Sequence, residues 1–141
     1  MTDSDSITSA QAPEPLGAYP HARRVGDLLY LSGIGPRRRG EEHIAGVIHG
    51  ARGHIVDHDI EAQCHAVFEN VKIILEAAGS TWLQLVDVTA FLTHLERDFP
   101  VYNRVYAEYF GEFPPCRTTV GVAKLPGPIA IELKCIATVE N

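Results

Sequence analysis

The 141-residue sequence has only three cysteines, no long apolar run and no excess of positive charge. Cys64, Cys116 and Cys135 are odd in number and lack paired spacing, which argues against a disulfide framework and against a CxxC metal site. We expect reduced thiols in a cytoplasmic protein. No stretch of about 18 apolar residues occurs, so a transmembrane helix is excluded. Residues 1–10 are polar, unlike a signal peptide.

The acidic balance and the missing motifs narrow the choice of ligand. Eighteen Asp and Glu against twelve Lys and Arg give a net charge of −6. This argues against general binding of nucleic acid, which depends largely on neutralising phosphates. The sequence has neither a P-loop nor a GxGxxG motif, so nucleotide binding has no support. His54 and His58 are four residues apart, but no cluster has zinc spacing, and we expect no metal site.

Positive charge is concentrated in one part of the chain. Residues 16–54 hold six arginines and three acidic residues, a local balance of +3 that leaves −9 for the remainder. Such a patch on an acidic protein suits a small anionic ligand better than a polyanion. The alternative is a solvated loop over residues 36–42.

The pattern of apolar residues and breakers predicts an α+β domain. We expect residues 1–14 to be flexible or a docking arm, and residues 15–141 to form a single domain. Apolar residues at spacings of three and four predict a helix over 57–78, capped by Asp57 or Asp59 and ended by Gly79. The other expected elements are two short strands within 23–33, a loop with some strand over 36–53, a strand over 85–94, a helix over 99–110, and strands over 117–125 and 129–139. Both helices are expected on one face of a sheet.

The last two strands are expected to form a hairpin around Pro126–Gly127–Pro128. Folding about this turn places Thr119 opposite Lys134, and alternation then puts Arg117 and Glu132 on the same face as both. An arginine binds a carboxylate in a two-point fork, and a nearby carboxylate can position water or move protons. The alternative is a solvated face whose ion pairs have little effect.

Four other side chains are interpreted as structural. Cys116 lies beside Arg117, which could lower the pKa of its thiol, but a packed or rim thiol is the favoured reading. Tyr102, Tyr106 and Tyr109 are interpreted as core residues on one side of the second helix.

The motifs along the chain resemble one known family. They are Ser32–Gly33, Asn70, Ala78–Gly79, Asn103 with Tyr106 and Phe110, Pro115–Cys116–Arg117, Ile131–Glu132 and Ile136–Ala137. From about residue 15 to 139 the chain resembles the RidA/YjgF family of enamine/imine deaminases. The resemblance implies a chorismate-mutase-like α+β fold with a mixed sheet, a homotrimer with sites between subunits, and no cofactor. It implies catalytic roles for Arg117 and Glu132. It implies pocket positions at Tyr19, Ser32, Gly33 and Asn103. Cys116 and Thr119, which flank Arg117 and depart from the usual family residues, are further candidates for substrate binding.

Departures from the usual family pattern resemble the 2-aminomuconate deaminase branch. They are the segments Arg117–Thr118–Thr119, Glu132–Leu133–Lys134, 19–24 and 37–39. This branch implies hydrolysis of 2-aminomuconate to 2-hydroxymuconate (4-oxalocrotonate) and ammonia, in aromatic or tryptophan-type catabolism. A dicarboxylate needs a second cation, which would be Lys134 or one of Arg37, Arg38 and Arg39. Three alternatives remain: a general 2-imino acid deaminase, a non-catalytic metabolite-binding trimer and, least favoured, a ribonuclease.

Overall fold

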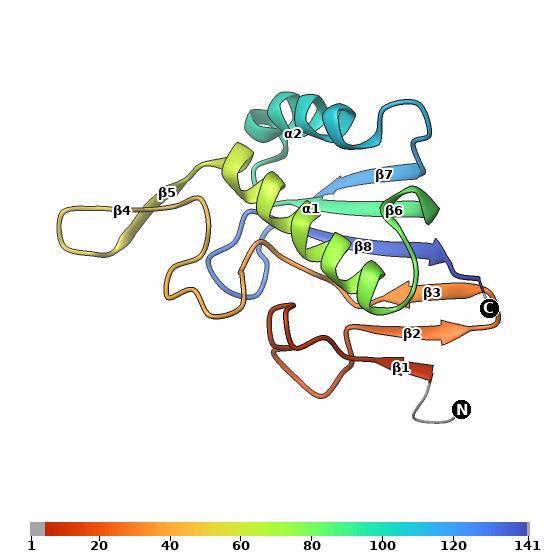
Figure 1. Cartoon of the computed structure of the whole chain (residues 1–141). Coiled ribbons are helices and arrows are strands. Elements are labelled where there is room, and N and C mark those ends of the chain that lie inside the picture. Colours follow the sequence, from red (N-terminus) through yellow and green to blue (C-terminus); the bar gives the residue numbers. More distant parts are fainter. Residues whose placement is uncertain (1–4, 141) are drawn as a thin grey trace.

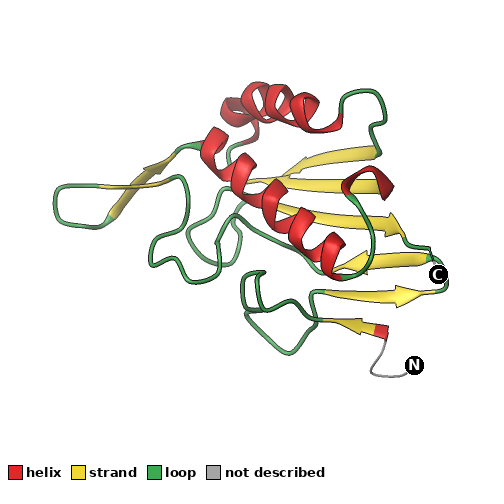
Figure 2. Cartoon of the chain, in the orientation of Figure 1, coloured by secondary structure: helices red, strands yellow, loops and turns green. Residues whose placement is uncertain are grey.

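The computed structural model describes residues 5–140, which form a six-stranded mixed sheet with two helices on one face (Figures 1 and 2). The sheet has the order β1-β2-β3-β8-β6-β7, and β4 and β5 pair as a separate hairpin that extends away from it (Figure 1). The elements are β1 (Ser6–Ile7), β2 (Ala22–Val25), β3 (Leu28–Leu31), β4 (Val47–His49), β5 (Ile55–His58), α1 (Ile60–Ala77), the 3-10 helix η2 (Trp82–Gln84), β6 (Leu85–Leu92), α2 (Leu95–Phe110), β7 (Cys116–Gly121) and β8 (Ile131–Thr138). The predicted α+β class is confirmed. Among the described residues, no helix has the length and apolar character needed to cross a membrane.

Helix α1 closely follows the prediction. Asp59 is its N-cap, and its carboxylate accepts a hydrogen bond from the backbone N–H of Ala62 at 3.3 Å. The predicted helix begins three residues too early because Asp57 and His58 end β5. Gly79 follows the helix with a φ of +81°, a conformation that side chains with a Cβ rarely adopt.

Helix α2 begins at Leu95, four residues before the predicted start. Glu96 and Asp98 lie in its first turn, where negative charge interacts favourably with the helix dipole. Its buried face includes Tyr102, Tyr106 and Phe110, which pack against Phe68 of α1 and Trp82. Tyr102 and Tyr106 are buried core residues, as predicted, and Tyr109 is partly buried against the same core.

The predicted hairpin of the last two strands is wrong. Strand β6 lies between β7 and β8, parallel to β7 and antiparallel to β8. Across β6, Val88 is the partner of both Arg117 and Cys135, whereas the hairpin would have placed Arg117 opposite Ile136. Because side chains alternate between faces, this shift of one residue moves Arg117 to the face opposite Glu132.

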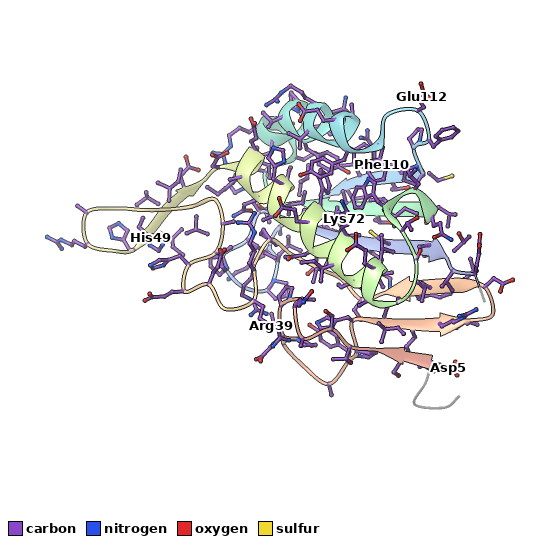
Figure 3. All side chains as sticks on the ribbon, in the orientation of Figure 1. Asp5, Arg39, His49, Lys72, Phe110 and Glu112 are labelled. Carbon is purple, nitrogen blue, oxygen red and sulfur yellow. The ribbon has the colours of Figure 1, made fainter. Side chains whose placement is uncertain are left out.

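The N-terminal segment packs against the domain from its first described residues. Strand β1 pairs with β2, and Ala12 is fully buried. Arg39, which lies among the loops on this side of the molecule (Figure 3), donates hydrogen bonds to the carbonyl of Ala12 and to the carboxylate of Glu14. Of the segment predicted to be flexible or a docking arm, residues 5–14 pack against the domain, and residues 1–4 lie outside the described part of the chain.

Candidate functional site

A cavity of about 260 Å³ lies at the start of β8. Its wall comes from the N-terminal segment, the stretch after β3 and the loop before β8; it includes Pro13, Glu14, Leu16, Ile34, Ile44, Ile74 and residues 126–129. Pockets for drug-sized ligands measure roughly 300–1,000 Å³, so this cavity suits a smaller metabolite. It is lined by five of the ten predicted site residues, namely Tyr19, Ser32, Gly33, Arg37 and Glu132.

Glu132 brings a carboxyl group into this cavity without a partner. Among the described residues, none forms a hydrogen bond or a salt bridge with it, and burial raises its pKa above the usual value. Gly33 makes room for it, because a Cβ on this glycine would lie 3.0 Å from Glu132 Oε2. A carboxyl group with a raised pKa and no hydrogen-bond partner is suited to take up and release protons.

Tyr19 and Ser32 hold the cavity wall in place. The hydroxyl of Tyr19 accepts a hydrogen bond from the backbone N–H of Leu16 at 3.0 Å. The hydroxyl of Ser32 donates to the carbonyl of Pro20 at 2.7 Å. The Tyr19 hydroxyl can still donate a hydrogen bond to a ligand, and the Ser32 hydroxyl can still accept one.

A buried histidine fastens the N-terminal segment behind this wall. His21 Nδ1 accepts a hydrogen bond from the N–H of Ser9 at 3.0 Å, which assigns the proton of the neutral ring to Nε2. His21 Nε2 then donates to the carbonyl of Pro13 at 2.7 Å. The segment is therefore attached at two points on either side of Ala12.

Arg117 lies apart from this cavity, beneath α2. Its guanidinium carbon is 4.7 Å from the ring centroid of Tyr106, 5.4 Å from that of Tyr102 and 5.7 Å from that of Phe99. These distances are within the range of cation–π attraction. Within the described part of the chain no carboxylate pairs with it, so aromatic faces hold the cation and leave its charge uncompensated.

Three buried hydroxyl groups belong to this part of the molecule, two on the tyrosines that contact Arg117 and one on the same strand, β7. Those of Tyr102, Tyr106 and Thr119 are buried without a hydrogen-bond partner among the described residues. Burial raises the pKa of Tyr102 and raises the pKa of Tyr106 to about 12, although Arg117 acts in the opposite direction on both. Both tyrosines are therefore neutral at pH 7 and do not cancel the charge of the arginine.

The remaining predicted site residues do not reach the cavity within this chain. Lys134 shares the open face with Glu132, but its ammonium group donates a hydrogen bond to the carbonyl of Leu31. Asn103 is exposed on α2, and Cys116 is exposed at the start of β7. The predicted clamp on one face, with Arg117 beside Glu132, is thus wrong within this single chain, for the reason of register given above.

One group of side chains has the composition of a metal site. His58, His94 and Asp98 bring their ligand atoms within 4.8 Å of one another. The guanidinium of Arg97 also lies in this group, with Nη2 2.7 Å from His58 Nε2 and Nε 3.1 Å from Asp98 Oδ1. The positive charge of Arg97 already contacts two of the three ligand atoms and disfavours a cation beside it, so we interpret the group as an ion-pair network that joins β5 to α2.

The sequence did not reveal that Asn70 anchors the loop after β3, or that Tyr102 and Tyr106 contact Arg117. Asn70, only 2% exposed, donates hydrogen bonds to the carbonyls of Gly35 and Arg37 at 2.9 and 2.8 Å. A polar residue within the apolar stripe of α1 was the available signal for Asn70. No sequence signal distinguished a tyrosine that contacts Arg117 from one that only packs in the core, because Tyr102 and Tyr106 do both.

Comparisons with known proteins cover nearly the whole chain. The family model described as Endoribonuclease L-PSP matches residues 9–139. The chain is 40% identical over 131 residues to a RutC family protein of Pyrococcus horikoshii, which covers 93% of this chain and 94% of that protein. It is 36% identical over 141 residues to a Dermatophagoides farinae protein named 2-iminobutanoate/2-iminopropanoate deaminase, with 99% and 100% covered. The crystal structure of E. coli TdcF with bound serine has a TM-score of 0.79 at 30% identity and covers 96% of this chain and 98% of that one.

Proposed function

Since the chain belongs to the Endoribonuclease L-PSP family, which includes the RidA, YjgF and RutC proteins, we propose that it is an enamine/imine deaminase. The substrate that we propose is 2-aminomuconate, which reacts with water to give 2-hydroxymuconate (4-oxalocrotonate) and ammonia. The relative from D. farinae is named for the same type of reaction on smaller substrates. TdcF binds serine, which also carries a carboxylate beside an amino group.

The observation that supports this chemistry is the unpartnered Glu132 carboxyl in the cavity. The enamine first gains a proton at carbon and loses one from nitrogen, which converts it to an imine. Water then adds to the imine carbon, the nitrogen takes up a proton, and ammonia leaves as the carbonyl forms. Glu132 would accept the proton from water and return it to nitrogen, a role that its raised pKa favours. The steps need only water and proton transfers, so the proposal includes no cofactor.

The two halves of the site lie on opposite faces of one chain, which favours an assembly. Glu132 lines the cavity, whereas Arg117 lies beneath α2. The family fold is a trimer-forming, chorismate-mutase-like one. We propose that this chain forms a homotrimer in which Arg117 of one subunit approaches the Glu132 cavity of the next. Arg117 would then bind the carboxylate beside the reacting carbon.

The experiment that tests the activity is ammonia release from enzymatically generated 2-aminomuconate, compared with 2-iminobutanoate. We expect turnover of the dicarboxylate by the wild type and loss of turnover in both Glu132→Gln and Arg117→Ala. Folded wild-type protein that releases no ammonia from either substrate would refute the deaminase proposal.

A mixing experiment tests the shared site. Glu132→Gln and Arg117→Ala subunits are each inactive alone, but a mixed trimer contains one site with both side chains. Random assembly of equal amounts should restore about a quarter of wild-type activity, because three quarters of trimers are mixed and each has one intact site of three. If both groups act within one subunit, mixing restores nothing.

General 2-imino acid deamination is the second candidate. It is favoured by the name of the D. farinae relative, whose substrates have a single carboxylate. The ratio of kcat/KM for 2-aminomuconate to that for 2-iminobutanoate separates the two candidates.

A further inference from the structure

The cavity contains one cation that the proposed reaction has not yet used. A dicarboxylate in this cavity meets the negative charge of Glu132, so its second carboxylate needs a positive partner. The sequence offers four basic residues for this role: Lys134, Arg37, Arg38 and Arg39. Their contacts distinguish them.

Lys134 and the two later arginines are engaged elsewhere. The ammonium group of Lys134 is bound to a backbone carbonyl of β3. Arg38 pairs with Glu69 at 3.0 Å and with Glu41 at 3.9 Å. Arg39 pairs with the carboxylate of Glu14 at 3.0 Å and also donates to backbone carbonyls of the N-terminal segment. None of these three basic residues lines the cavity.

Arg37 differs from all three. It lines the cavity, and within residues 5–140 its guanidinium forms no ion pair. Its Nη2 donates to the backbone carbonyl of Glu14 at 2.5 Å, which steers the group without neutralising its charge. A guanidinium has five N–H donors, so a planar pair remains for a ligand.

The backbone of Arg37 is also fixed in place. Asn70 Nδ2 holds its carbonyl and that of Gly35 at once, from a buried position on α1. A cation on an anchored backbone loses little further freedom when it binds a ligand, which strengthens the contact.

We infer that Arg37 binds the second carboxylate of a dicarboxylate substrate and so determines the preference for dicarboxylates over monocarboxylates. This inference rests on the proposed function, in which Arg117 of a neighbouring subunit holds the first carboxylate. A monocarboxylate substrate has no group for Arg37 to bind, and its turnover should depend on this residue far less.

The test is Arg37→Gln, with Arg38→Gln as the matched control. The control removes the same charge one residue away, at a position outside the cavity. For Arg37→Gln, the ratio of kcat/KM for 2-aminomuconate to that for 2-iminobutanoate should fall about 10- to 100-fold, the usual effect of losing a hydrogen bond to a charged group. Arg38→Gln should keep the wild-type ratio. Parallel losses on both substrates, or the same ratio change in both variants, would overturn the inference.

Equilibrium binding keeps the inference testable if the enzyme turns over neither substrate. Muconate and 2,4-hexadienoate share a diene chain but have two carboxylates and one. Calorimetry should show that Arg37→Gln weakens muconate binding about 10- to 100-fold and leaves the binding of 2,4-hexadienoate within about threefold. Unchanged muconate binding would refute the role of Arg37, whereas absent turnover with this selective loss would refute the deaminase proposal alone.

Discussion

Replacing Tyr106 tests whether aromatic rings prepare Arg117 for its ligand. Tyr106 has the nearest of the three rings, 4.7 Å from the guanidinium carbon. Cation–π contacts contribute about 0.5–2 kcal/mol, with the higher values at desolvated sites. Since Tyr102 and Phe99 remain, we expect Tyr106→Leu to weaken the placement of Arg117 by about 1 kcal/mol. That corresponds to about a fivefold rise in KM for a carboxylate substrate.

Tyr106→Phe supplies the internal comparison, because it keeps the ring and removes only the hydroxyl. That hydroxyl is buried without a partner among the described residues, so its loss should leave both KM and the free energy of unfolding nearly unchanged. Tyr109→Leu is the matched control on the same helix, since Tyr109 packs against Phe68 and Trp82.

The assay measures KM and kcat for 2-iminobutanoate together with urea unfolding for all three variants. We expect Tyr106→Leu alone to raise KM, beyond any change shared with Tyr109→Leu. If Tyr106→Phe raises KM as much as Tyr106→Leu does, the hydroxyl and not the ring is what matters, and the reasoning fails.

Three further predictions concern the other half of the site and the ion-pair network. Burial raises the pKa of Glu132, so ionisation of this carboxyl destabilises the folded chain. Glu132→Gln should therefore raise the Tm at pH 7. The gain in Tm should vanish as the pH falls below about 4, where glutamate in the unfolded chain is also protonated. Equal stabilisation at pH 3 and pH 7 in thermal melts would contradict this account. Gly33→Ala should lower kcat because the added Cβ meets Glu132 Oε2 at 3.0 Å, and unchanged kcat in steady-state assays would show that the carboxyl moves freely. Asp98→Asn should lower the free energy of unfolding by about 2 kcal/mol in urea titrations, since a buried carboxylate loses charged hydrogen bonds. Arg104 lies on the same helix as Asp98, and its ion pairs with Glu61 and Glu108 are exposed. Arg104→Gln should therefore stay within about 0.5 kcal/mol of the wild type, and it serves as the control.

Local features of the fold were well predicted from sequence, and its long-range pairing was not. The 3.6-residue stripe and Asp59 define α1, because helix formation depends on near neighbours. Strands β7 and β8 each pair with β6, which precedes both in sequence. Nothing near residues 126–128 signals that this strand lies between them. A turn sequence between two strands indicates a reversal of direction but does not require the strands to be neighbours.

The same limit explains the candidate site. Alternation along the last strand and the family resemblance pointed to Glu132, and the resemblance alone pointed to Tyr19, Ser32 and Gly33. The structure brings Gly33 beside Glu132 because Ile34 pairs with Leu133 of β8. It pointed to Arg117 as a residue but misplaced its side chain, since a register error of one residue reverses the face. The choice among the arginines also required structure, because three adjacent arginines have the same chemistry and only their contacts differ.

The docked N-terminal segment links the stability of one part of the chain to occupancy of the cavity. Pro13, Glu14, Leu16 and Tyr19 form a wall of the cavity, yet β1 has only two residues and contributes little pairing. Local opening of this segment would remove the wall without unfolding the sheet. A ligand that contacts the wall must therefore stabilise the closed segment by the same free energy with which the closed segment strengthens ligand binding. A group joined to the chain before Ser9 that favours opening of this segment would therefore weaken substrate binding, although it lies far from any catalytic group.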